Sequence, residues 1–247
     1  APPAKRCATR RMRVLLTRPL ADSKELADVL ARRGIDSLIE PLLAIDYLDP
    51  PLELSGVQAL AVTSANGARA LARVWPRHAE RPPVFAVGRS SAAAATAAGF
   101  TQVTAGEGDV EALARLIAAR LDPGQGAVLH ASGSEAAGDL CGQLRRLGFT
   151  TRRAVLYRAA PANNLSAGVR AALCGGSLDG VLLYSPRTAE IFARLIRAAE
   201  LAESCRVLRA YCLSPNVAAA AELPFREVLI AAQPSETALL ELLSTPR

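Results

Sequence analysis

The sequence predicts an α/β protein made of two similar lobes, each a parallel sheet flanked by helices. Short apolar runs alternate with helical periodicity along the chain, as in successive βα units of a parallel sheet. Four segments also recur in the same order in both halves, which indicates an internal duplication. The matched pairs are 13–45 with 127–159, 60–74 with 182–196, 85–100 with 209–225, and 109–121 with 235–243.

The composition favours a globular, soluble protein. The chain has 247 residues, of which 51% are hydrophobic, so a sizeable core can be buried. No apolar run approaches the roughly 20 residues of a membrane span, so we expect no membrane partner. Much of the net charge of +6 comes from Lys5, Arg6, Arg10 and Arg11, and we therefore expect no nucleic-acid partner. Residues 1–11 lack an apolar signal-peptide core and are expected to form a disordered extension.

The first helix of each copy carries sequence signals at both ends. In the first copy, Asp22 and Glu25 predict a capping box at the helix start. The apolar stripe that follows ends at Gly34, which predicts the helix stop. In the second copy, Ser132 with Glu135 and then Gly148 predict the same arrangement.

Polar turns follow the predicted strands. The strand at 60–62 breaks into Thr63-Ser64-Ala65-Asn66-Gly67, which is either a plain strand-to-helix turn or a set of N–H and hydroxyl groups for an anionic ligand. Because ligands bind beyond the carboxyl ends of parallel strands, two facing lobes would line one cleft with such turns. Arginines in these polar turns favour a ligand that carries carboxylates or phosphates. The turns are 17–19, 63–67, 87–91, 130–134, 184–188 and 212–216, with Arg18, Arg89 and Arg187.

Several kinds of chemistry lack their sequence signals. There is no phosphate-loop motif, and the pattern that begins at 106–109 has Glu111 where a dinucleotide fingerprint needs its third small residue. The five cysteines are irregularly spaced, which predicts no metal site and favours a reducing cytoplasm. His130 follows an apolar run without a recognisable nucleophile partner, and we interpret it as a structural residue at a strand end.

Tyr157 breaks the internal symmetry. The repeat places it opposite Leu43, so a phenol stands where the other copy has an aliphatic side chain. One interpretation is amphipathic packing at a strand edge. The other is a weak acid that points into the cleft.

Taken together, these segments resemble the uroporphyrinogen-III synthase family. The resemblance rests on VLLTRP (14–19), TSANG (63–67), AVG (86–88), the SP of YSPRT (184–188), LS (213–214) and PSETALLELL (234–243). It implies two lobes joined by a two-stranded linker. The first lobe would comprise 12–39 and 162–247, the second 52–149, and the linkers 40–51 and 150–161.

The resemblance also implies an activity. Family members cyclise hydroxymethylbilane, a linear tetrapyrrole rich in carboxylates, to uroporphyrinogen III with loss of water and inversion of ring D. This hydro-lyase reaction of tetrapyrrole biosynthesis needs no metal or cofactor. Tyr157 matches a family tyrosine and is expected to assist departure of the hydroxyl. Expected substrate-binding residues are Arg18, Thr63, Ser64, Asn66, Ser91, Ser185, Arg187 and Ser214.

The remaining expectations concern partners and alternatives. We expect a cytoplasmic monomer that acts on a small molecule and has at most transient contact with the preceding enzyme of the pathway. Three residues depart from the family pattern, namely Tyr184, Arg187 and Cys212. The chief alternative is a non-catalytic, two-lobed binder of a small polyanion, and another is an α/β enzyme that acts on phosphorylated substrates.

Overall fold

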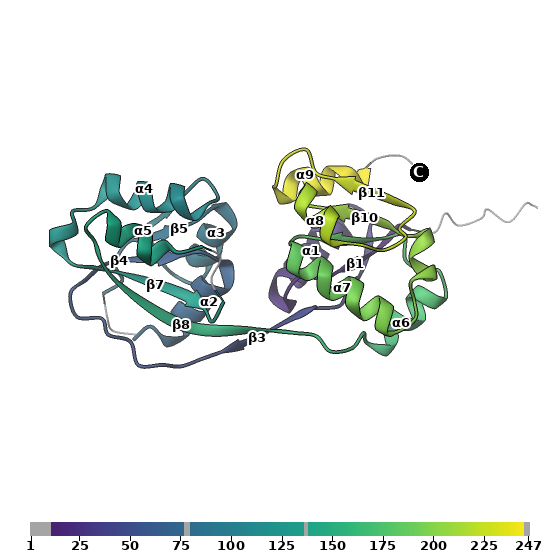
Figure 1. Cartoon of the computed structure of the whole chain (residues 1–247), viewed down its shortest axis with the longest axis horizontal. Coiled ribbons are helices and arrows are strands. Elements are labelled where there is room, and N and C mark those ends of the chain that lie inside the picture. Colours follow the sequence, from purple (N-terminus) through teal and green to yellow (C-terminus); the bar gives the residue numbers. More distant parts are fainter. Residues whose placement is uncertain (1–10, 77–79, 136–137, 245–247) are drawn as a thin grey trace, which may run out of the picture. The chain divides into compact units, whose positions relative to one another are not determined.

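The computed structural model describes residues 11–76, 80–135 and 138–244 (Figure 1). It confirms the predicted α/β class, with parallel sheets flanked by helices. The chain divides into two compact units. Unit 1 comprises Ala1–Ala44 and Ala160–Arg247, and unit 2 comprises Ile45–Ala159. All but one residue of the extension predicted at 1–11 lie outside the described residues.

Unit 1 is a five-stranded parallel sheet with helices on both faces. The strand order is β11-β10-β9-β1-β2. Helices α6, α7 and α8 cover one face, and α1 and α9 cover the other (Figure 1). The elements are β1 (Arg13–Leu16), α1 (Leu20–Arg32), β2 (Asp36–Ile39), α6 (Ala167–Cys174), β9 (Gly180–Leu183), α7 (Pro186–Ala198), β10 (Arg209–Cys212), α8 (Pro215–Ala220), β11 (Glu227–Ile230) and α9 (Glu236–Glu241).

Unit 2 is a six-stranded sheet in the order β3-β8-β7-β4-β5-β6. Helices α2 and α3 pack on one face, and α4 and α5 pack on the other. The elements are β3 (Leu43–Tyr47), β4 (Val57–Val62), α2 (Ala65–Val74), β5 (Val84–Ala86), α3 (Arg89–Ala97), β6 (Val103–Ala105), α4 (Val110–Arg120), β7 (Ala127–Gly133), α5 (Leu140–Arg146) and β8 (Thr150–Pro161).

The two sheets repeat one strand order. The series β11-β10-β9-β1-β2 corresponds to β6-β5-β4-β7-β8, and β3 is an additional strand of unit 2. Each unit therefore combines the first part of one sequence repeat with the later part of the other. The chain passes between the units within β3 and within β8, which are neighbours in the sheet and joined by the Leu48 N–H to the Leu156 carbonyl.

The helix starts differ from the sequence predictions. Asp22 does not cap α1, because the helix begins directly after Pro19 and Asp22 lies buried in its first turn. Ser132 does not cap a helix either, since β7 continues to Gly133, which pairs with Tyr157 of β8. The capping residue of α5 is Asp139, whose carboxylate accepts a hydrogen bond from the Gly142 N–H at 2.8 Å.

The register of one repeat also shifts. Ser64 caps α2 and Ser185 caps α7, so these two serines are structurally equivalent. The match of 60–74 with 182–196 is therefore displaced by one residue, and Tyr184 corresponds to Thr63. Both serines directly precede helices that follow buried strands, where a side-chain oxygen satisfies an otherwise free backbone N–H.

Candidate functional site

In unit 2, the predicted site residues lie after the ends of β4 and β5, and Tyr157 lies within β8 beside Gly133, the last residue of β7. Ser64 Oγ accepts a hydrogen bond from the Gly67 N–H at 2.9 Å, as the cap of α2. The same oxygen lies 2.9 Å from the Tyr157 hydroxyl, contributed by a strand 93 positions away in the sequence. Gly67 allows this approach, because a Cβ there would lie 2.8 Å from the Ala131 carbonyl oxygen. The turn after β4 is thus fixed by both β7 and β8.

Tyr157 is buried, with 8% of its surface exposed. Its ring lies over Gly133, where an added Cβ would come within 2.7 Å of the ring carbon Cζ. Ser64 Oγ already accepts the Gly67 N–H, so its own proton can go to the Tyr157 oxygen. The phenolic proton is then left to be donated elsewhere. The ring of Tyr157 therefore packs on the sheet and its hydroxyl contacts Ser64, while its role as a weak acid stays a prediction.

Thr63 points to the other face of the sheet, where it meets His130. Its hydroxyl lies 3.1 Å from His130 Nε2, and His130 Nδ1 lies 3.8 Å from the Cys141 sulfur. Burial, followed by the charge of Arg153, lowers the pKa of His130 to about 4, and the charge of Asp139 acts in the opposite direction. The imidazole is therefore neutral at pH 7. The apolar run before His130 correctly indicated a strand, but β7 continues to Gly133, so His130 lies within the strand and not at its end. No sequence signal linked this histidine to Thr63.

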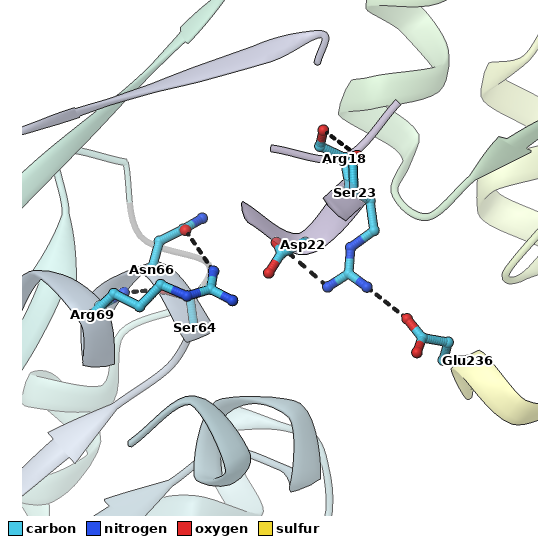
Figure 2. A network of polar contacts seen from close by, with 8 residues as sticks. Arg18, Asp22, Ser23, Ser64, Asn66, Arg69 and Glu236 are labelled. Carbon is cyan, nitrogen blue, oxygen red and sulfur yellow. Dashed lines mark hydrogen bonds and ion pairs between the residues drawn. The ribbon is translucent and has the colours of Figure 1, made fainter. Parts of the chain in front are cut away.

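Arg153 was not recognised in the sequence. Its Nε donates to Ser132 Oγ at 2.9 Å, and its terminal nitrogen donates to the carbonyls of Gly133 at 2.9 Å and Ser134 at 3.1 Å. It therefore holds the end of β7 against β8. Of the other predicted residues of unit 2, Asn66 accepts a hydrogen bond from Arg69 at 3.3 Å (Figure 2). Ser91 is buried in the first turn of α3.

In unit 1, Arg18 follows β1 and is already engaged with carboxylates. Its guanidinium lies 2.7 Å from Glu236 and 3.5 Å from Asp22 (Figure 2). It also stacks on the Tyr184 ring, 4.7 Å from the ring centre. Burial, followed by the charge of Glu236, raises the pKa of Tyr184 well above its usual range. The sequence did not predict Asp22 or Glu236 as neighbours of Arg18. Both form ion pairs with the guanidinium that was predicted to bind substrate.

The other residues predicted in unit 1 lie at the starts of helices. Ser185 Oγ accepts from the Thr188 N–H at 3.2 Å and lies 2.8 Å from the Thr188 hydroxyl. Arg187 is half-buried in the first turn of α7. Ser214 occupies the cap position of α8 without a capping hydrogen bond from its side chain. Each of these residues follows the carboxyl end of β9 or β10.

The site chemistry suits anions more than metals. Hydroxyls and helix N-termini lie directly after the ends of parallel strands, and such groups bind carboxylates and phosphates. Across the described ranges, no group of three or more histidine, cysteine, aspartate or glutamate side chains could hold a metal ion. Nor do the described helices include one that is long and apolar enough to cross a membrane.

Fold and site thus define an α/β protein with duplicated parallel sheets and donor-rich strand ends. The family model for "Uroporphyrinogen-III synthase HemD" matches residues 24–241. The chain belongs to the uroporphyrinogen-III synthase family.

Solved structures show the same fold. Uroporphyrinogen-III synthetase from Helicobacter pylori is 18% identical with a TM-score of 0.61, and the match covers 94% of this chain and 98% of that one. A mutant uroporphyrinogen III synthase from Thermus thermophilus is 18% identical with a TM-score of 0.52, and the match covers 94% of this chain and 97% of that one. No curated protein matches the sequence significantly.

Proposed function

We propose that this chain is an active uroporphyrinogen-III synthase. It would convert hydroxymethylbilane to uroporphyrinogen III by eliminating the terminal hydroxyl of ring A as water and closing the ring with ring D inverted. The observation that supports this most directly is the hydrogen-bonded pair of Ser64, which follows β4, and Tyr157, which lies in β8 beside the carboxyl end of β7. Membership of the family supplies the reaction.

Tyr157 has the chemistry needed at the departing hydroxyl. A phenol can donate a hydrogen bond to this oxygen as the C–O bond breaks. The proton lost from the pyrrole N–H of ring A completes the water that departs and leaves a neutral azafulvene. Ser64 would keep the phenol oriented by donating to its oxygen, while the Gly67 N–H holds Ser64. The azafulvene left behind is attacked by the substituted carbon of ring D, and the resulting spiro intermediate opens and closes again in the inverted sense.

The remaining donors would hold the carboxylates of the substrate. Thr63, Asn66 and Ser91 would do so in unit 2, and Ser185, Arg187 and Ser214 in unit 1. Arg18 would exchange a present carboxylate partner for one of the substrate. Donors fixed before the substrate arrives lose little orientational freedom on binding, and they favour one folded form of a flexible chain.

The proposal is tested by the identity of the product. Hydroxymethylbilane is generated in the reaction vessel by its synthase, this protein is added, and the oxidised uroporphyrin isomers are separated by chromatography. We expect predominantly isomer III. Isomer I alone, which arises without the enzyme, would refute the proposal and leave a binder of polyanions.

The proposal extends to the setting of the enzyme. It would act as a cytoplasmic monomer, with at most transient contact with the enzyme that supplies its substrate. Sedimentation at working concentration, alone and with that enzyme, should give the mass of a single chain. A stable dimer would contradict the monomer.

A further inference from the structure

His130 has no part in the mechanism above, yet it contacts Thr63, the first residue after β4. It is 2% exposed and sits in the middle strand of the sheet, in register with Ala61 of β4 and Arg153 of β8. Both ring nitrogens have partners, the Thr63 hydroxyl at 3.1 Å and the Cys141 sulfur at 3.8 Å. Because the ring is held between these two partners, its protonated nitrogen decides whether the Thr63 hydroxyl accepts a hydrogen bond from His130 or donates one to it.

The Cys141 thiol indicates the direction of these hydrogen bonds. A thiol sulfur is a weak acceptor, whereas an imidazole nitrogen that carries no hydrogen is a good one. The contact at 3.8 Å is therefore better made with the S–H donated to His130 Nδ1, which leaves Nε2–H to be donated to Thr63 Oγ1.

The charge states of the buried groups agree with this direction. His130 is neutral, because its pKa of about 4 reflects burial and the nearby Arg153, against the weaker effect of Asp139. Burial raises the pKa of Cys141, so the thiol keeps its proton. A neutral imidazole has one N–H and one acceptor nitrogen. If Nδ1 accepts from the thiol, the N–H is on Nε2 and must be donated to Thr63.

We propose that His130, held by Cys141, is a positioning residue that makes Thr63 a hydrogen-bond donor. With Nε2–H donated to its oxygen, the Thr63 hydroxyl proton is directed to a ligand. Thr63 would therefore bind a carboxylate of the substrate rather than a pyrrole N–H. The assignment of the ligand rests on the proposed function, but the hydrogen-bond direction does not.

The direction is measured on the unaltered protein. The sequence contains one other histidine, His78, so the spectrum of His130→Gln assigns the signals. Nitrogen-15 NMR at pH 7 should show a neutral His130 ring with hydrogen on Nε2 and a bare Nδ1. Hydrogen on Nδ1 would overturn the proposal, whether or not the protein makes isomer III.

The consequence for the substrate is measured by a double-mutant cycle. Thr63→Val should raise KM about tenfold, since a hydrogen bond to a charged group is lost. His130→Leu should raise KM similarly, His130→Gln should restore much of the affinity through its amide N–H, and the double variant should be no worse than Thr63→Val alone. Independent, multiplying effects would overturn the coupling.

A control separates positioning from packing. Leu113 is fully buried on the same face of the sheet and belongs to the apolar cluster there. Leu113→Val should lower the melting temperature and leave KM unchanged. An equal rise of KM in this variant would show that His130 acts only through the core, and the proposal would fail.

Discussion

At the scale of single residues, Tyr157 carries the sharpest prediction. Tyr157→Phe removes the hydroxyl and keeps the ring over Gly133, so packing is retained. Turnover should fall about tenfold or more, because the departing hydroxyl loses its donor. Stopped assays of isomer III give kcat, and thermal unfolding provides the control for folding. Unchanged turnover would make Tyr157 purely structural.

Glu236 is a second test residue, because it occupies the guanidinium of Arg18. Surface ion pairs are worth about 0.2–1 kcal/mol, so Glu236→Gln should lower KM by about 1.4- to fivefold if Arg18 binds a substrate carboxylate. Glu203→Gln is the matched control, since Glu203 pairs with Arg206 at 2.6 Å in the same unit and is not a predicted site residue. A KM that stays constant in Glu236→Gln would remove Arg18 from the site.

His130 predicts a pH dependence of stability. Its folded pKa of about 4 lies below the ordinary value of 6.5, so the unfolded chain binds more protons between these values. Stability is therefore lost as the pH falls from 6.5 toward 4, by about 3 kcal/mol. The facing groups are Thr63, Cys141, Arg153 and Asp139.

The measurement is denaturant unfolding at several pH values. His130→Gln cannot titrate, so its stability should fall less over this range than that of the unaltered protein. Parallel curves would show that other groups cause the whole pH dependence.

At the scale of elements, the approach of α2 to β7 depends on Gly67. In Gly67→Ala, the new Cβ would lie 2.8 Å from the Ala131 carbonyl oxygen, which cannot move without disturbing the sheet. We expect a loss of about 1–3 kcal/mol in the free energy of unfolding. Gly168 in α6 is the matched control, since nothing lies within 4 Å of its added Cβ and Gly168→Ala should stabilise by about 0.4–1 kcal/mol. A neutral Gly67→Ala would contradict the close packing.

The same scale shows which boundaries the sequence could predict. Gly34 and Gly148 have positive φ values of 73° and 88°, and both mark helix stops as expected. The helix starts at Asp22 and Ser132 were wrong. Capping patterns report only local preferences, whereas β7 is prolonged by its pairing with β8. A strand partner thus outweighs a local helix signal.

At the scale of the whole molecule, unit 2 is continuous in sequence and holds two apolar clusters of its own. A fragment of residues 43–161, which retains β3 and β8 whole, should therefore fold alone. Circular dichroism during heating should show one cooperative transition. A gradual, featureless melt would contradict this. The predicted lobe boundaries at 12–39, 52–149 and 162–247 stay a prediction. Limited proteolysis of the whole chain would test them, because cleavage should fall in the predicted linkers between the lobes.

The sequence by itself determined the α/β class, the duplication, and the hydroxyl-rich turns after the strands. These are properties of short windows, where periodicity and turn chemistry act within a few residues. Only the tertiary structure decided which strand ends meet. It placed Ser64 against Tyr157 and Thr63 against His130, pairs 93 and 67 positions apart, and it surrounded Arg18 with carboxylates. Such pairs depend on strand order and register, which are set by the packing of distant segments and leave no local pattern.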